Sequence, residues 1–385
     1  MELALNPAKQ QELLSFLQAL VRYPTEDPPG REIELARFLH DTLAGWGLVA
    51  ELDEFAPGRA NVIARLAGGG APGLAFSAHT DTLPAGSREW IHPPFAAELV
   101  DGRVYGRGTA DMKGGIAAMA FAARRLHAAG VSLKGPLVLA FSAGESSSCL
   151  GARRMVAVDA LHDVGALLIS EPSTLGVLTA EMGALWLRVS AVGTAGHASA
   201  GGGGDNAILK ILDAAARLRA LDLGDDHHPL LGRPGLRINT MAGGSAINLT
   251  PDHAELGVDI RYLPGMDPGA IREQVAAALG EGVAVTVIDD KPPVEVAPGH
   301  PLVATCLAAC RDVLGSVGEP GGVSYFSDGT VLCPALGLPR VIVGPGALGM
   351  SGQRDEYVVV ERLMAACEIY TRVAMAWLGG SWGAG

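Results

Sequence analysis

The chain has 385 residues, of which 49% are hydrophobic and 18% are charged. A disordered chain has far fewer apolar residues than this, so we expect a folded globular protein of roughly two or three domains. The 41 acidic and 29 basic side chains give a formal charge of −12, which disfavours nucleic acid and anionic membrane surfaces as partners.

The sequence contains no pattern typical of a membrane span or a secretion signal. Its apolar stretches, such as residues 114–123, are interrupted well before the roughly 18 to 20 residues that a membrane span needs. The first residues lack the basic start and continuous apolar block of a signal peptide. The five cysteines form no Cys-X-X-Cys pair, which fits reduced thiols better than disulfides. We therefore expect a cytoplasmic protein with no membrane partner.

The first 180 residues alternate predicted helices and buried strands. Asn6 can cap a first helix that has Pro7 in its first turn, and a second helix covers residues 33–46. A helical stretch at 112–129 provides the crossover that a parallel sheet requires. Short apolar runs predict buried strands at residues 60–66, 73–77, 136–142 and 166–170.

From about residue 183 the pattern changes to alternating apolar and polar positions, which is typical of half-buried strands. The predicted order of elements is βαββαβ, which is the ferredoxin-like order. These elements are strands near 185–192, 235–241, 253–261 and 283–288, and helices at 205–221 and 267–279.

After residue 289 a helix (301–314), a buried strand (340–343) and a final helix (360–378) return to the first pattern. We therefore expect an α/β domain that is interrupted by an inserted α+β domain. The predicted boundaries are 1–182 with 292–385 for the α/β domain, and 183–291 for the insertion.

Five polar residues come at the ends of the predicted strands or just before the crossover helix. They are His79, Asp81, Asp111, Glu145 and Glu171. Because ligand sites in open α/β sheets form at the carboxyl ends of the strands, we expect these side chains at one edge. One histidine, two ligand carboxylates and one free carboxylate suit a zinc-class ion whose water the free group activates. The structural alternatives are an ordinary helix cap for Asp111 and polar loop residues for His79 and Asp81.

Several short motifs together resemble a known family. They are Ser77-Ala-His-Thr-Asp-Thr-Leu-Pro84, Gly106-Arg-Gly108, Asp111-Met-Lys-Gly-Gly115 and Ser170-Glu-Pro-Ser173. In order and spacing they resemble the co-catalytic zinc amidohydrolases, which include acetylornithine deacetylase, succinyl-diaminopimelate desuccinylase, aminoacylase and carboxypeptidase G. The resemblance implies a zinc-peptidase-like α/β domain with a central, mostly parallel sheet. It also implies that the insertion is a lid through which the protein forms a homodimer.

The resemblance implies roles for the residues of the α/β domain. His79 and Glu171 would ligate one metal ion, and Asp111 would bridge from that ion toward a second. Asp81 would orient the ring of His79. Glu145 would be the general base.

Three residues of the insertion also match the family. The resemblance implies that His197 helps to stabilise the tetrahedral intermediate, often across a dimer interface. It implies further that Asn248 and Arg261 bind the carboxylate of the substrate. As structural alternatives, His197 is a simple turn residue and Arg261 is a solvated strand end.

The chain departs from the family at the two other ligands of the second ion. Ser146 stands where the family has the second of two glutamates, and Gly352 stands where the family has a histidine. The last histidine of the chain is His300, so no shift of the alignment provides one. A hydroxyl is a poor ligand for a zinc-class ion and glycine offers no side-chain ligand. We therefore expect one ion, zinc or alternatively cobalt or manganese, and we expect that restoring both family residues restores the second.

These observations favour a metallo-amidohydrolase whose small-molecule substrate is an N-acyl amino acid or a related amide. The expected type is that of acetylornithine deacetylase and succinyl-diaminopimelate desuccinylase. One alternative is an inactive or metal-poor homologue that acts as a binding protein or partner subunit. Another is an enzyme that performs acyl transfer or condensation on the same scaffold.

Overall fold

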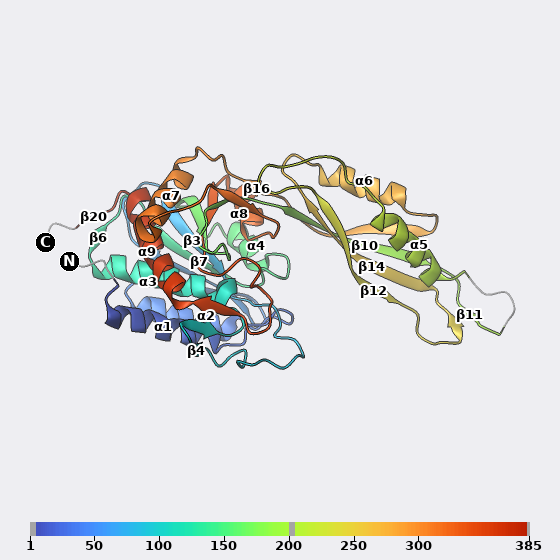
Figure 1. Ribbon diagram of the computed structural model, residues 1–385, viewed down its shortest axis with the longest axis horizontal. Coiled ribbons are helices and arrows are strands. Elements are labelled where there is room, and N and C mark those ends of the chain that lie inside the picture. Colours follow the sequence, from blue (N-terminus) through green and yellow to red (C-terminus); the bar gives the residue numbers. More distant parts are fainter. Residues whose placement is uncertain (1–4, 200–204, 383–385) are drawn as a thin grey trace. The chain divides into compact units, whose positions relative to one another are not determined.

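Figure 1 shows the computed structural model of the protein, which describes residues 5–199 and 205–382. Contacts divide the chain into two compact units. The first unit comprises Met1–Thr179, Val296–Gly321 and Ser327–Gly385, and the second comprises Ala180–Glu295 and Gly322–Phe326.

A mixed sheet forms the centre of the first unit. In spatial order its strands are β1 (Val49–Ala56), β2 (Arg59–Leu66), β7 (Leu137–Ser142), β3 (Gly73–His79), β8 (Val164–Ile169) and β18 (Arg340–Ile342). Strands β7, β3, β8 and β18 run parallel to one another. Strands β1 and β2 pair antiparallel beside them. Four of the five predicted buried runs therefore form the parallel centre, whereas the run at residues 60–66 forms the antiparallel strand β2.

Shorter strands extend this framework. Strand β9 (Leu178–Glu181) pairs with β18, and also with β16 (Val294–Glu295) and β17 (Gly321–Val323). Strands β4 (Glu98–Val100), β5 (Arg103–Tyr105) and β19 (Tyr357–Val359) form a small separate sheet, and β6 (Val131–Ser132) pairs with β20 (Ser381–Trp382).

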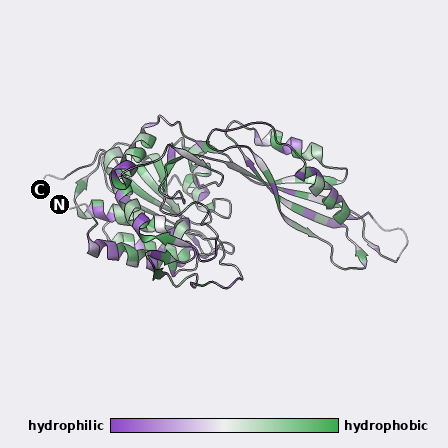
Figure 2. Ribbon diagram, in the orientation of Figure 1, coloured by the Kyte–Doolittle hydropathy of each residue, from purple (hydrophilic) through white to green (hydrophobic). Residues whose placement is uncertain are grey.

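Helices pack on the central sheet. The helices are α1 (Pro7–Val21), α2 (Ile33–Gly45), α3 (Gly114–Ala128), α4 (Leu150–Ala157), α7 (Pro301–Leu314), α8 (Gly329–Leu336) and α9 (Val360–Trp377). Helix α9 packs against α1, α3 and α7, and α4 packs against α8. The side chain of Asn6 caps α1, as predicted. Hydrophobic colour runs through the interior strands in Figure 2, because β3 and β7 are buried along their whole length.

The second unit has the predicted βαββαβ order. Its elements are β10 (Gly183–Val192), α5 (Ala207–Arg219), β12 (Gly235–Gly243), β14 (His253–Tyr262), α6 (Pro268–Ala278) and β15 (Val283–Lys291). The strands form an antiparallel sheet in the order β12-β14-β10-β15, which is the ferredoxin-like arrangement. Leu185, Leu187 and Val189 of β10 pack with apolar residues of both helices. A short ladder joins β11 (Gly196–His197) to β13 (Leu249–Thr250).

Two details differ from the sequence-based expectation. Strand β1 was not expected, because acidic residues interrupt its apolar positions and the strand is half exposed at the edge of the sheet. Helix α5 begins at Ala207, whereas the sequence predicts a helix from residue 205, and the side chain of Asn206 caps it. Within the described residues, none of the helices combines the length and apolar character needed to cross a membrane.

Candidate metal centre

His79 ends the buried central strand β3, and its ring is held by the backbone. Nδ1 of His79 lies 2.9 Å from the main-chain oxygen of Asp81. A carbonyl oxygen only accepts, so Nδ1 carries a proton and Nε2 faces the neighbouring carboxylates. Nε2 lies 3.0 Å from Oδ1 of Asp111 and 3.6 Å from Oε1 of Glu171. An imidazole ring among these carboxylates either carries a second proton on Nε2 or binds a cation together with them.

Asp111 lies in the turn η1 (Thr109–Lys113), directly before α3, and its own backbone angles are not helical. The glycines after it let α3 begin very close to the end of β8. A Cβ atom on Gly115 would lie only 2.0 Å from Oγ of Ser170. Glu171 follows Ser170, so this close approach brings the carboxylates of Asp111 and Glu171 to the same point.

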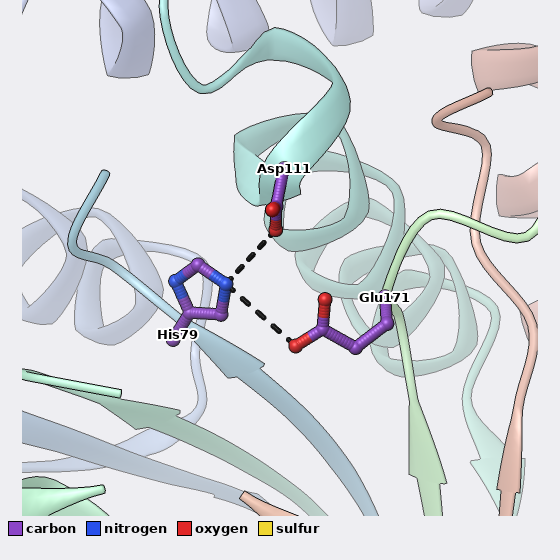
Figure 3. Close-up of side chains that lie close together, drawn as sticks. All are labelled: His79, Asp111 and Glu171. Carbon is purple, nitrogen blue, oxygen red and sulfur yellow. Dashed lines mark hydrogen bonds and ion pairs between the residues drawn. The ribbon is translucent and has the colours of Figure 1, made fainter. Parts of the chain in front are cut away.

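Figure 3 shows His79, Asp111 and Glu171 pointing toward one another from three separate elements. One ligand atom from each side chain lies within 4.8 Å of the other two. The set comprises one imidazole nitrogen and two carboxylates, which fits a zinc-class ion with an open coordination position. These three residues are the ones that the sequence indicates as metal ligands.

The electrostatics of this cluster also fit a bound cation. Burial raises the pKa of Glu171 well above its usual value, and the nearby charge of Asp111 raises it further. Burial alone would lower the pKa of His79, but the surrounding carboxylates raise it well above its usual value. Buried carboxylates in such proximity repel one another unless a proton or a metal ion lies between them.

Glu145 and Asp81 lie together beside this cluster. The backbone nitrogens of Glu145 and Ser146 each donate to a carboxylate oxygen of Asp81, both at 3.0 Å. Burial raises the pKa of Glu145 well above its usual value. The Asp81 carboxylate lies 3.6 Å from Nδ1 of His79, beyond hydrogen-bond length. The expected link from Asp81 to His79 is therefore made by the backbone oxygen of Asp81, while its carboxylate holds the loop of Glu145.

The two positions that depart from the family have distinct surroundings. Ser146 follows Glu145 directly, and Gly352 lies in the loop that precedes β19. Gly352 has a φ of +73°, a conformation that favours glycine. Its neighbour Ser351 donates a hydrogen bond from its hydroxyl to Oδ2 of Asp111.

The structure adds buried residues that sequence reasoning missed. Asp328 accepts a hydrogen bond from the hydroxyl of Ser142 at the end of β7, and burial raises its pKa to about 6. Glu356 accepts from the backbone nitrogens of Ala110 and Asp111, at 2.9 and 3.1 Å. Both acids lie more than 150 residues from their partners, so the local sequence gives no signal of these contacts.

In the second unit, His197 and Asn248 lie side by side. Nδ2 of Asn248 is 3.4 Å from Nε2 of His197, and the hydroxyl of Ser199 is 2.7 Å from Nδ1. Arg261 lies apart from this pair, near the other end of β14. It forms an ion pair with Asp259 at 3.0 Å.

A mixed α/β fold that carries a largely buried His-Asp-Glu set and a neighbouring free carboxylate defines a metal-dependent hydrolase. The chain belongs to peptidase family M20/M25/M40, whose model matches residues 75–376. It is a metallo-amidohydrolase.

Similar proteins agree with this family. A Staphylococcus epidermidis protein, named probable succinyl-diaminopimelate desuccinylase, is 28% identical over 404 residues, which cover 96% of this chain and 98% of that protein. Human carnosine dipeptidase 1 has a TM-score of 0.80 at 17% identity, covering 97% of each chain. The Bacillus subtilis YXEP protein, described as a dinuclear metal binding peptidase, has a TM-score of 0.70 at 17% identity, covering 97% of this chain and 99% of its own. The structural matches show the fold.

Proposed function

We propose that this protein hydrolyses the amide bond of an N-acyl amino acid, with one metal ion bound by His79, Asp111 and Glu171. The proposal rests mainly on the position of Glu145. Its carboxylate is buried, is not one of the three candidate ligands, and interacts electrostatically with His79 and Asp111. The similarity to probable succinyl-diaminopimelate desuccinylases favours an acyl amino acid over a longer peptide.

In this mechanism the chain supplies the groups that orient the reactants and move protons. When bound, a zinc-class ion polarises the carbonyl group and lowers the pKa of water. Glu145 takes a proton from the attacking water and delivers it to the leaving nitrogen, so it acts first as general base and then as general acid. Burial raises its pKa above the usual value of a glutamate. The backbone oxygen of Asp81 fixes the ring of His79, and the Asp81 carboxylate fixes the backbone at Glu145.

We propose that zinc is the native ion, with cobalt or manganese as substitutes, and that only one ion binds. The His-Asp-Glu set accepts any of these metals. The single-ion stoichiometry is supported by the donors at the second position, where Ser146 and Gly352 offer a hydroxyl and no side chain.

We also propose that the second unit, taken as the insertion 183–291, is a lid and forms a homodimer. Arg261 lies eight residues along β14 from His253, where that strand begins near the His197 and Asn248 pair. At about 3.3 Å per residue, this separation is roughly 26 Å. One small substrate cannot contact both ends of β14, so His197 and Arg261 act on it together only when two chains contribute. Oxyanion stabilisation by His197 and carboxylate binding by Asn248 and Arg261 are part of this proposal.

Two surfaces support a dimer through the second unit. Strand β12 is an edge strand, and within the described residues it pairs on one side only. Leu209 and Leu212 of α5 are 59% and 47% exposed. An open strand edge near exposed leucines is typical of an interaction surface.

The substitutions at Ser146 and Gly352 favour a second candidate, a non-hydrolytic binding protein or partner subunit. Acyl transfer or condensation on the same scaffold would use the same site. The cytoplasmic location that we expect from the sequence stays a prediction.

A substrate panel tests the proposed function. Protein loaded with one equivalent of zinc is incubated with N-acetyl and N-succinyl amino acids and with dipeptides, and the released amines are measured by mass spectrometry. We expect release of the free amino acid from at least one acyl amino acid. Binding of these compounds without product contradicts hydrolysis and favours the binding protein. An acylated product formed only when a second amine is present favours acyl transfer.

A further inference from the structure

The two carboxylate oxygens of Asp111 have different partners. Oδ1 lies 3.0 Å from Nε2 of His79, on the side where the three candidate ligands converge. Oδ2 accepts a hydrogen bond from the hydroxyl of Ser351. A carboxylate that bridges two ions needs one oxygen free for each of them. In this chain the second oxygen already has a partner.

The hydrogen bond between Ser351 and Asp111 is built into the surrounding structure. Arg107 is buried and donates to the backbone oxygen of Gly352, which follows Ser351, at 3.3 Å. The same guanidinium pairs with Glu356 at 2.6 Å. Glu356 in turn accepts from the backbone nitrogen of Asp111 at 3.1 Å. One buried ion pair therefore positions both residues of this hydrogen bond.

A hydroxyl in this position binds the carboxylate oxygen that a second cation would otherwise bind. The O–H group directs a partial positive charge at the oxygen and fixes the plane of the carboxylate. Unlike a cation, it needs no further ligands, and Ser146 and Gly352 supply none that a zinc-class ion would favour.

We propose that the Ser351 hydroxyl replaces the second metal ion at Oδ2 of Asp111 and positions this carboxylate to bind a single ion through Oδ1. Ser351 is thus a positioning residue, and this proposal rests on the single-ion site proposed above. Partners that hold metal ligands in place typically contribute 10- to 100-fold in metal affinity.

Metal binding tests this role without any substrate. Zinc affinity is measured by competition with a chromophoric chelator for the wild type, Ser351→Ala and Ser351→Thr, and bound zinc is counted by elemental analysis. Ser147→Ala is the matched control, since Ser147 is partly buried and the structure gives its hydroxyl no hydrogen bond among the described residues. Thermal unfolding of the metal-free proteins checks that each variant is folded.

We expect Ser351→Ala to bind one zinc ion with at least tenfold lower affinity, and Ser351→Thr and Ser147→Ala to bind it as the wild type does. Equal affinity of Ser351→Ala and wild type overturns the proposal. Two tightly bound ions in the wild type also overturn it, because Oδ2 would then be a metal ligand. Failure of the proposed hydrolysis is a separate result, since it appears in the substrate panel and leaves these affinities unchanged.

Discussion

Arg107 and Glu356 form a buried ion pair, with Nη1 of the arginine 2.6 Å from Oε2 of the glutamate. The other carboxylate oxygen of Glu356 accepts from the backbone nitrogens of Ala110 and Asp111. The pair thus connects the loop before β19 to the turn that carries a candidate metal ligand. Breaking it should therefore affect both the stability of the fold and the binding of metal.

We expect Arg107→Met to lower the free energy of unfolding by about 3 to 5 kcal/mol, because it leaves the buried charge of Glu356 unpaired. Chemical denaturation of the metal-free protein measures this change. The control is Arg103→Met, which removes an exposed arginine four residues away and should leave the unfolding free energy near that of the wild type. Similar stabilities for the two variants would contradict a structural role for the buried pair.

Glu145 distinguishes an enzyme from a binding protein. Glu145→Gln keeps the shape of the side chain but removes its proton acceptor. We expect the rate of hydrolysis to fall by about 10²- to 10⁴-fold, which is the usual contribution of a general base. The zinc content should not change, because Glu145 is not one of the proposed ligands. Unchanged turnover in this variant would rule out the proposed mechanism.

We expect the stability of the protein to depend on pH through the buried carboxyl group of Glu32. It shares one guanidinium, that of Arg59, with Asp27, at 2.9 and 2.8 Å respectively. Burial and the nearby charge of Asp81 raise the pKa of Glu32 to about 7. The folded state therefore holds a proton on Glu32 between its ordinary pKa and about pH 7, whereas the unfolded state has lost it. The stability that Glu32 contributes is present at low pH and decreases as the pH rises through this range.

Glu32→Gln isolates that contribution, because glutamine carries no titrating proton. Between pH 5 and pH 7 the wild type should lose about 2 kcal/mol of unfolding free energy relative to this variant. Denaturation curves of both proteins at several pH values measure the difference. Glu34→Gln, at an exposed glutamate nearby, should show no such trend. A constant difference for Glu32→Gln would show that its pKa is the same in both states.

The proposed dimer depends on the exposed leucines of α5. We expect the paired change Leu209→Asp and Leu212→Asp to convert a dimer into monomers, because it puts charges into an apolar interface. Sedimentation equilibrium at micromolar concentration measures the mass. Leu314→Asp in the first unit, at a leucine that is 40% exposed, should leave the dimer intact. A wild type that sediments as a monomer would contradict the dimer and with it any contribution of His197 from a partner chain.

The sequence predicts most of the fold because its strands and helices follow from local patterns of apolar and polar residues. Continuous apolar runs mark the buried central strands of the first unit, and alternating apolar and polar positions mark strands β10 and β14 of the second. The close set of His79, Asp111 and Glu171 follows from the same reasoning, because each residue lies next to a predicted strand end or helix start. Their chemical roles stay predictions.

Other features depend on contacts that no local pattern reports. Ser351 and Glu356 reach Asp111 from some 240 residues further along the chain, through a loop with no regular structure. Asp81 has the expected neighbours. Whether its backbone oxygen or its carboxylate contacts His79 depends on the exact path of the chain after β3. These are tertiary effects, so composition and periodicity do not contain them.

The final prediction revises the expectation that restoring the two family ligands restores the second ion. Gly352 has a φ of +73°, and a Cβ atom there would lie 3.0 Å from Cδ1 of Leu83. A histidine in this conformation costs about 1 to 2 kcal/mol, and Oδ2 of Asp111 already accepts from Ser351. We therefore expect the double variant Ser146→Glu and Gly352→His to be less stable and to bind the second ion weakly.

Adding Ser351→Ala to that double variant should strengthen binding of the second ion, because the substitution frees Oδ2 of Asp111 for a metal. Elemental analysis after gel filtration counts the ions in each protein, and thermal unfolding of the metal-free forms compares their stabilities. Ser147→Ala in the same background is the control and should leave the second site weak. A double variant that is as stable as the wild type and carries two ions would show that the loop accepts histidine freely and that Ser351 does not compete with metal for Asp111.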